Sequence, residues 1–521
     1  MQQTLTSYSY WHRKTLRNER NSHLHTRGLL IEGSPKMERG FWISIPVFLI
    51  ACYFLRDSTR PVPVILGLLM AALCMLPGYL WVSRKVKGMP VFPIFGLGHL
   101  LGYAMPLITG EQRVMSYSDS IITPAALQIC AYLLVGTIIW YLFATREPQL
   151  PRSCWYMDLD RGTRIFIPIL AICILIHMSG NGSWYFIWKY VPGPLISVIN
   201  QSTLALGILT CFALAYQIGT GHIPKKHVPG VILMIYALVF VTNLSLVMIQ
   251  AITTWIVSMA GYFLGSRKIP WIHFFAGFAF FAFLHQGKMQ MRELRAQGAW
   301  ASIQPWEYPA YMSHWAYLAI NAFRQIHTLK AFDDELGTAD AQTFNERASV
   351  IQQFLLVFQE TPKSVPFFRG ETYKVSWLMF IPSQVYRLFG LDRSDVHVTT
   401  RMLTIRYGLQ TEEQAQFTTI SMGHLAEAYA NFGFMGLILL GVVWGSVYGI
   451  LTWWSVGMPL FSFRSLLSVI FVLTAFQYEW TSSVVFSVLG SYTCALFFCG
   501  LVFMKVRPLI SPFTYSSSER N

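Results

Sequence analysis

Long apolar stretches with almost no charge constrain this chain more than any other feature of its sequence. The uncharged or nearly uncharged windows are 40–55, 61–83, 89–110, 120–145, 165–188, 190–221, 228–266, 269–287, 433–463 and 465–504. A helix needs about 20 apolar residues to cross the hydrocarbon of a bilayer, so these windows predict transmembrane helices. We therefore expect an all-α integral membrane protein.

Two of the windows, 228–266 and 465–504, are long enough for two crossings each. Asn243-Leu-Ser interrupts the first, and Glu479 with Trp480 interrupts the second. Counting both windows twice predicts about 12 transmembrane helices. Helices 1–9 then occupy residues 41–285, and helices 10–12 occupy residues 433–504.

The composition agrees with a membrane protein. Charged residues make up only 12% of the chain, whereas soluble domains carry about 25%. A net charge of +14 would suggest a nucleic-acid partner in a soluble protein. Here most of the excess lies in short loops beside apolar windows, where it signals orientation. No cysteine lies in the polar stretch 287–432, which excludes a disulfide framework and a cysteine metal site there.

The basic residues predict which loops are cytoplasmic. With the N-terminus in the cytoplasm and sides alternating, 22 of the 39 Lys and Arg are cytoplasmic and 4 lie in short outer loops. Cytoplasmic loops of membrane proteins are enriched in this way. Both tails, 1–40 and 505–521, are therefore expected inside, and one large helical loop, 286–432, outside. The N-terminal tail does not resemble a signal peptide. Met37 is an alternative start, in which case residues 1–36 carry no function.

Four arginines close the large loop, just before the chain is expected to enter the membrane at Gly433. They are Arg387, Arg393, Arg401 and Arg406. Guanidinium groups bind phosphate through two parallel hydrogen bonds and keep their charge. Such a cluster at the outer surface suits a lipid-linked phosphate or pyrophosphate. The alternative is contact with anionic headgroups, or salt bridges to Asp392, Asp395, Glu412 and Glu413.

Two further groups in the loop carry candidate chemistry. Lys288 and Arg292 form a second basic group at its start, which meets the arginines if the loop folds back; the alternative is a helix end with basic anchors. His424 and Glu427 are three residues apart and share one face of a helix. They suit a general base with its orienting partner, or a plain surface pair at the interface.

The remaining motifs are weaker indications of a functional site. His99 stands in a proline- and glycine-rich window that can line a cavity, although packed and hydrogen-bonded histidines are commoner. Asp333-Asp334-Glu335 is best read as a solvated turn. No metal site or nucleotide-binding motif is recognisable.

The layout and several motifs resemble the O-antigen polymerase (Wzy-like) family, the polymerases of oligosaccharide repeat units. The layout has about a dozen helices, a long extracytoplasmic loop late in the chain and a few helices after it. The local match runs from His424 to Gly436, with the pattern Glu-x-Tyr-x-Asn-Phe-Gly-x-x-Gly, preceded by Ile381-Pro and the arginines. Residues 287–292 are similar to a segment of exopolysaccharide relatives.

This resemblance implies a metal-independent, membrane-embedded glycosyltransferase without a cofactor. It implies transfer of a glycan from undecaprenyl pyrophosphate to a lipid-linked acceptor at the outer face of a bacterial inner membrane. The four arginines, with Lys288 and Arg292, are candidates to stabilise the pyrophosphate leaving group, and Glu427 or His424 to act as the base. The implied partners are the lipid-linked oligosaccharide, the bilayer and a chain-length regulator.

Three alternatives stay open at this point. An O-antigen ligase shares the chemistry and differs in the acceptor. A flippase or exporter of lipid-linked sugars would show charges inside its helices and repeat symmetry. A membrane O-acyltransferase would use an intramembrane histidine such as His99 or His177.

Overall fold

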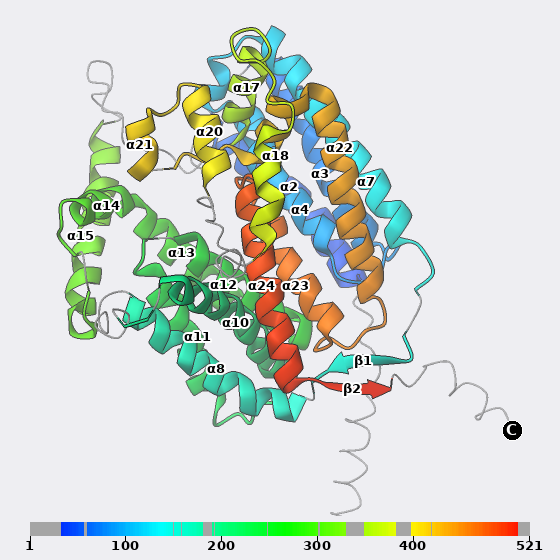
Figure 1. Cartoon of the computed structure of the whole chain (residues 1–521), viewed down its shortest axis with the longest axis vertical. Helices are drawn as coiled ribbons and strands as arrows, with labels where there is room; N and C mark the ends of the chain where they lie inside the picture. Colours follow the sequence, from blue (N-terminus) through cyan, green and yellow to red (C-terminus); the bar gives the residue numbers. More distant parts are fainter. Residues whose placement is uncertain are drawn as a thin grey trace, which may run out of the picture.

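The computed structural model describes most of the chain between residues 33 and 508. The described ranges are 33–56, 60–148, 151–157, 159–180, 190–191, 193–246, 248–300, 303–329, 349–381, 397–417 and 419–508. Within them the chain is mostly helical (Figure 1), and eight helices are long and apolar enough to cross a membrane. Three shorter apolar helices accompany them. The prediction of an all-α, multi-pass membrane protein is thus confirmed.

The first group of helices begins with α2 (Pro35–Phe54) and α3 (Pro61–Val82), each with a proline in its first turn, where the missing N–H is not needed. The third apolar window forms α4 (Val91–His99), a π-helix (Leu100–Ala104) and α5 (Met105–Thr109) in succession. After the short α6 (Gln112–Met115) comes α7 (Asp119–Ala144). Helix α3 packs against both α4 and α7.

The second group comprises α8 (Leu159–Gly180), α10 (Gly193–Gly219), α11 (Val228–Asn243), α12 (Met248–Ser266) and α13 (Trp271–Gln286). The break between α11 and α12 falls at the predicted Asn243-Leu-Ser. Helices α10 and α12 approach each other very closely at Gly261. A Cβ added there would lie only 2.4 Å from the Phe212 carbonyl oxygen. Small residues commonly allow such approaches in membrane helices.

The segment expected outside the membrane is also helical where it is described. Its elements are α14 (Lys288–Ala296), a 3₁₀ turn (Pro305–Glu307), α15 (Tyr308–Leu329), α17 (Ile351–Glu360), α18 (Glu371–Ser376), a second 3₁₀ turn (Trp377–Phe380), α20 (Val398–Arg406) and α21 (Glu412–Phe417). Helices α14 and α15 pack beside α13, whereas α17 packs against α7 and α22 (Gly423–Ser455), and α18 and α20 pack against α24 (Ser482–Phe503) (Figure 1).

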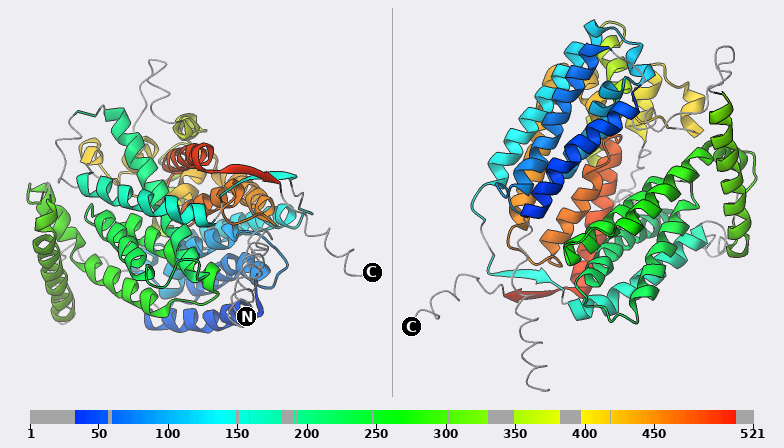
Figure 2. Two further views of the ribbon diagram at one scale, coloured as in Figure 1. Left: turned by 90° about the horizontal axis from the view of Figure 1, so that it is seen from below. Right: turned by 180° about the vertical axis from the view of Figure 1, so that it is seen from behind.

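The last helices are α22 (Gly423–Ser455), α23 (Phe463–Ala475) and α24 (Ser482–Phe503). The window 465–504 is therefore divided around Glu479 and Trp480, as predicted. Strand β1 (Ser153–Tyr156) pairs antiparallel with β2 (Lys505–Pro508), and Tyr156 also bridges to Ser462. Three segments expected on the cytoplasmic side thus meet at one end of the molecule, opposite α17 (Figure 2).

Helix α22 is a helical hairpin. Gly433 has φ 60° and ψ −142°, a combination that is essentially restricted to glycine. The rings of His424 and Trp444 lie 6.4 Å apart, whereas 20 residues of straight helix would separate them by about 30 Å. A Cβ on Gly436 would also lie 2.2 Å from the Ala428 carbonyl oxygen. Residues 423–432, the short arm, therefore fold back along residues 434–455, the long arm.

Candidate functional site

The short arm of α22 places both residues of the predicted His424–Glu427 pair inside the protein. His424 is 5% exposed and Glu427 has no exposed surface. The alternative of a surface pair at the interface therefore does not apply to these two side chains. The long arm, α7 and α4 surround the short arm, and the Gly433 reversal is what brings it among them.

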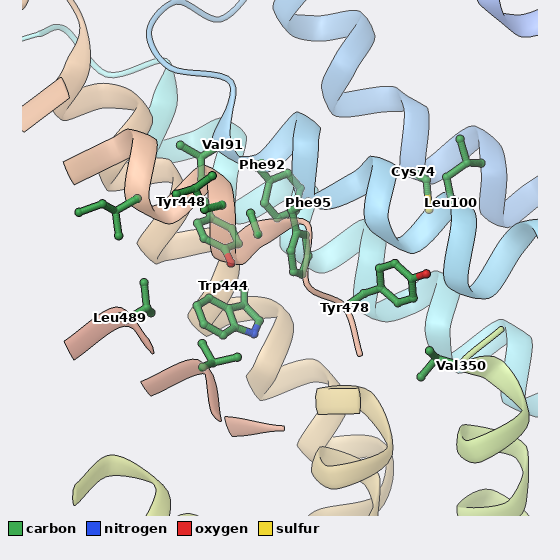
Figure 3. Close-up of a cluster of buried hydrophobic side chains, with 14 of the residues drawn as sticks. Cys74, Val91, Phe92, Phe95, Leu100, Val350, Trp444, Tyr448, Tyr478 and Leu489 are labelled. Carbon is green, nitrogen blue, oxygen red and sulfur yellow. The ribbon is translucent and has the colours of Figure 1, made fainter. Parts of the chain in front are cut away.

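His424 lies in an aromatic cluster inside the bundle. Its ring stacks on Phe95 at 5.9 Å and lies 5.3 Å from the ring of His99. Its Nε2 is 3.5 Å from the Tyr132 hydroxyl. Figure 3 shows Trp444 and Tyr448 of the long arm beside Phe92 and Phe95 of α4, with Tyr478 on the other side of Phe95. The cluster fixes the orientation of His424.

His99 is part of the same cluster and not a separate site. Its Nδ1 lies 2.9 Å from the Phe95 carbonyl oxygen, whereas its buried Nε2 and the buried Tyr103 hydroxyl have no hydrogen-bond partner in the described structure. The His99 and Tyr103 rings stack at 5.3 Å. Tyr103 belongs to the π-helix that follows α4, and such π segments are frequent at functional sites. The glycine-rich spacing around His99 is the sequence signal for this irregularity.

Glu427 binds the beginning of α24. Its Oε2 accepts a 2.7 Å hydrogen bond from the Ser482 backbone N–H, and its Oε1 accepts one from the Ser482 hydroxyl. The first N–H groups of a helix have no intrahelical partner and carry partial positive charge. A buried carboxylate needs such donors to be stable. Glu427 therefore holds the short arm of α22 against α24.

A network of hydroxyl groups extends from Ser482 into the predicted outer segment. Ser482 Oγ lies 2.7 Å from Ser376 Oγ, at the end of α18. Thr400 of α20 lies 2.7 Å from the hydroxyl of Thr481, the residue before Ser482. Thr399 Oγ1 is 3.3 Å from Ser376 Oγ. The sequence does not reveal this network, because its members are far apart in the chain and follow no local pattern.

Asn431 connects the tip of the hairpin to the same segment. Its Nδ2 donates to Thr372 Oγ1 and to the Glu427 carbonyl oxygen, both at 2.8 Å. Its Oδ1 accepts from the Gly370 N–H at 2.9 Å. Nearby, burial and the Glu427 carboxylate raise the pKa of the Tyr373 hydroxyl well above its ordinary value, so Tyr373 stays neutral. Its ring stacks on Phe432 at 6.2 Å.

The Glu-x-Tyr-x-Asn-Phe-Gly-x-x-Gly pattern thus describes a hairpin and its attachments. Glu427 and Asn431 make the polar contacts, Gly433 makes the reversal, and Gly436 allows the two arms to touch. Tyr429 packs against Phe354 of α17, with ring centroids 5.7 Å apart. We call the contact region of the hairpin tip, α18, α20 and the start of α24 the junction.

The structure describes two of the four predicted arginines. Arg401 is half-buried on α20, directly after Thr400, so its backbone is held at the junction. Arg406 is exposed at the end of α20, and its guanidinium lies over the Phe368 ring at 4.9 Å. Arg387 and Arg393 lie outside the described residues.

The basic group at the start of the segment lies in another part of the molecule. Arg292 donates to the Leu246 carbonyl oxygen at 3.3 Å, and its neighbour Arg295 donates to that of Leu244 at 3.4 Å. Cations at a helix C-terminus are favourable, and these carbonyls follow the end of α11. Lys288 is the first residue of α14, the helix that also carries Arg292 and Arg295, and it is 9% exposed. The contacts described for Arg292 match the alternative of a basic helix anchor.

Comparisons with protein-family models, with curated proteins and with solved structures found no match to this chain.

Proposed function

We propose that this chain polymerises lipid-linked oligosaccharide repeat units, in the biosynthesis of O-antigen or exopolysaccharide. The donor would be a glycan on a polyprenyl pyrophosphate, and the acceptor a second lipid-linked unit at the outer face of a bacterial inner membrane. The observation that carries the proposal is the junction. It holds a buried carboxylate and a half-buried arginine where the bundle meets the predicted outer segment.

The junction supplies two things that this reaction needs. The acceptor hydroxyl attacks the anomeric carbon of the donor, the bond from that carbon to the pyrophosphate oxygen breaks, and the hydroxyl proton passes to a base. Negative charge grows on the leaving pyrophosphate, and a fixed guanidinium such as that of Arg401 stabilises it. Within the proposal, Glu427 and His424 are the candidate bases for the hydroxyl proton.

The contacts of Glu427 also give it a positioning role. Both of its oxygens already accept hydrogen bonds from Ser482. It therefore fixes the hairpin relative to α24. Through Ser482, Ser376 and Thr399 it is also connected to α20, the helix that carries Arg401 and Arg406. His424 is fixed by its aromatic neighbours at the level of Tyr132. The proposal needs this rigidity because a displaced catalytic group loses rate steeply.

Deletion of the gene in its native host tests the function. Loss of a polymerase leaves single repeat units on the final acceptor, because export and the last transfer still operate. Loss of a ligase instead leaves long polymer on the polyprenyl carrier, and loss of a flippase leaves lipid-linked units at the inner face. Gel analysis of the surface glycan and of the extracted carrier lipids separates these outcomes. Either of the last two patterns would overturn the proposal.

A further inference from the structure

An apolar cavity of about 510 Å³ opens between helices α10, α11, α12 and α13. Its walls include Ile232, Ile235, Val239, Trp255 and Met259. Ligand sites commonly have this size and combine apolar walls with a few placed polar groups. The cavity lies in the second group of helices and shares no lining residue with the junction.

Two of the polar side chains that line the cavity form a pair. The Tyr236 hydroxyl lies 2.6 Å from Nδ1 of His273, and both side chains line the cavity. A hydroxyl and an imidazole at this place are able to hydrogen-bond the ester region of a lipid, while the aliphatic walls accept its chain.

Basic residues directly precede the lining residues at the end of the cavity from which α11 and α13 start. The lining includes Val228 and residues 269–271, which follow the two basic pairs Lys225-Lys226 and Arg267-Lys268. All four basic side chains are exposed. The chain contains no Asp or Glu between Asp160 and Glu293, and within the described ranges none of the four forms an ion pair.

The depth of the polar pair matches a phospholipid. Lys268 lies three residues before Trp271, the first residue of α13, and His273 lies two residues, or about 3 Å, into that helix. The headgroup layer of one leaflet is about 5–8 Å thick. A phosphate beside the basic pairs therefore places the glycerol esters near Tyr236 and His273, and an acyl chain in the apolar part.

We propose that this cavity binds an anionic phospholipid from the leaflet that faces residues 222–227 and 266–270. The four cations bind the headgroup phosphate, and the space between α11 and α13 holds one acyl chain. Basic pockets between transmembrane helices bind anionic headgroups by the same chemistry. The charge arrangement favours an anionic over a zwitterionic lipid, because no acidic side chain of this region offsets the four positive charges.

Native mass spectrometry of the full-length detergent-purified protein tests the site. Phosphatidylglycerol and phosphatidylcholine with identical acyl chains are added in equal amounts. We expect retention of phosphatidylglycerol, and a loss of about fivefold in its affinity for each charge removed in a Lys225→Gln/Lys226→Gln variant. The control variant Arg84→Gln/Lys85→Gln removes two exposed charges elsewhere and should retain the lipid.

A second pair of variants tests the acyl-chain part. Ile232→Trp fills the cavity, whereas Leu233→Trp places the same ring on a neighbouring residue that is 69% exposed. The first should lose phosphatidylglycerol and the second should keep it, with both proteins monodisperse on gel filtration. Equal retention of the two lipids by the parent protein would overturn the proposal. Unchanged phosphatidylglycerol binding in the Lys225→Gln/Lys226→Gln and Ile232→Trp variants would also overturn it. The same holds if a polyprenyl phosphate displaces the bound lipid and phosphatidylglycerol does not.

Discussion

Burial of Glu427 places an ionisable side chain where water does not reach it, and its two hydrogen-bond acceptors are both used. Removing one partner from a buried hydrogen bond costs about 1–3 kcal/mol, because the other partner stays unsatisfied. The Ser482 N–H and hydroxyl are the partners at risk. The same residue is thus a candidate base by its chemistry and a fastening point by its contacts, and substitutions separate the two roles.

Glu427→Gln should abolish polymer formation. The glutamine amide keeps the shape of the side chain, but it is no base and it turns one acceptor into a donor. Ser482→Ala removes the hydroxyl contact and keeps the backbone N–H contact with the carboxylate. We expect Ser482→Ala to make polymer if Glu427 acts as the base, and both variants to lose abundance and polymer if Glu427 only fastens the hairpin. Polymer length on gels and protein level on blots are the measurements. If both variants made normal polymer at normal abundance, Glu427 would be neither the base nor a residue that fastens the hairpin.

Arg401 and Arg406 should respond differently to the same conservative change. Arg401→Lys keeps the charge but loses the paired hydrogen bonds of the guanidinium. Loss of a charge-stabilising contact in a transition state costs about 3 kcal/mol, or roughly a hundredfold in rate. Arg406→Lys keeps a cation over the Phe368 ring and should leave the rate nearly unchanged, so it is the matched control on the same helix. The rate of polymer formation from lipid-linked units in membranes is the measurement. Equal rates for the two variants would remove Arg401 from the pyrophosphate site.

At the scale of elements, the sequence predicted the helices and their breaks better than their directions. Short polar interruptions at Asn243 and at Glu479 marked the ends of α11 and α23, because a backbone break in an apolar stretch needs nearby polar groups. The reversal at Gly433 was not predicted, because hydropathy reports which residues avoid water and not which way the chain runs. Residues 423–432 are largely apolar and were expected at the end of the outer loop.

The candidate site was predicted in part for a similar reason. The resemblance pointed to residues 424–436, and these residues do form the hairpin. Their hydroxyl partners at Ser376, Thr400 and Ser482 come from three distant elements, so no spacing rule connects them. Serine and threonine are also common in ordinary helix packing, so a hydroxyl network of this kind cannot be distinguished from packing contacts in the sequence.

Gly433→Ala should destabilise the protein measurably. A residue with a side chain in this backbone conformation costs about 1–3 kcal/mol, and the added Cβ would lie 3.3 Å from the Phe367 ring. Gly40→Ala in α2 is the control, because no atom lies within 4 Å of its Cβ position. The midpoint of thermal unfolding in detergent, followed by tryptophan fluorescence, should fall for Gly433→Ala. For Gly40→Ala it should stay or rise slightly, because alanine is the better helix former. An unchanged midpoint in both would mean that the hairpin does not depend on glycine at its tip.

For the molecule as a whole, the sheet of β1 and β2 brings together segments that are far apart in the chain. It joins the connection after α7, the connection before α23 and the segment after α24. Charge patterning predicts the same side of the membrane for all three. The junction and α17 lie at the opposite end of the molecule (Figure 2), where the outer segment is expected. The positions of these two ends relative to the membrane follow from the positive-inside prediction and are open to a direct test.

Cysteine labelling in intact cells measures that orientation. Glu413→Cys places a thiol on α21, and Glu147→Cys places one on the connection between α7 and β1; both positions are exposed. Each change removes an acidic residue, which contributes little to orientation, so the basic residues that set the topology stay in place. We expect a membrane-impermeant maleimide to react with the cysteine at position 413 in intact cells, and with that at position 147 only after the membrane is permeabilised. The parent chain, with its eight native cysteines, gives the background. The reverse pattern would place the junction in the cytoplasm, where no lipid-linked unit awaiting polymerisation at the outer face would reach it, and would overturn the proposed function together with the topology.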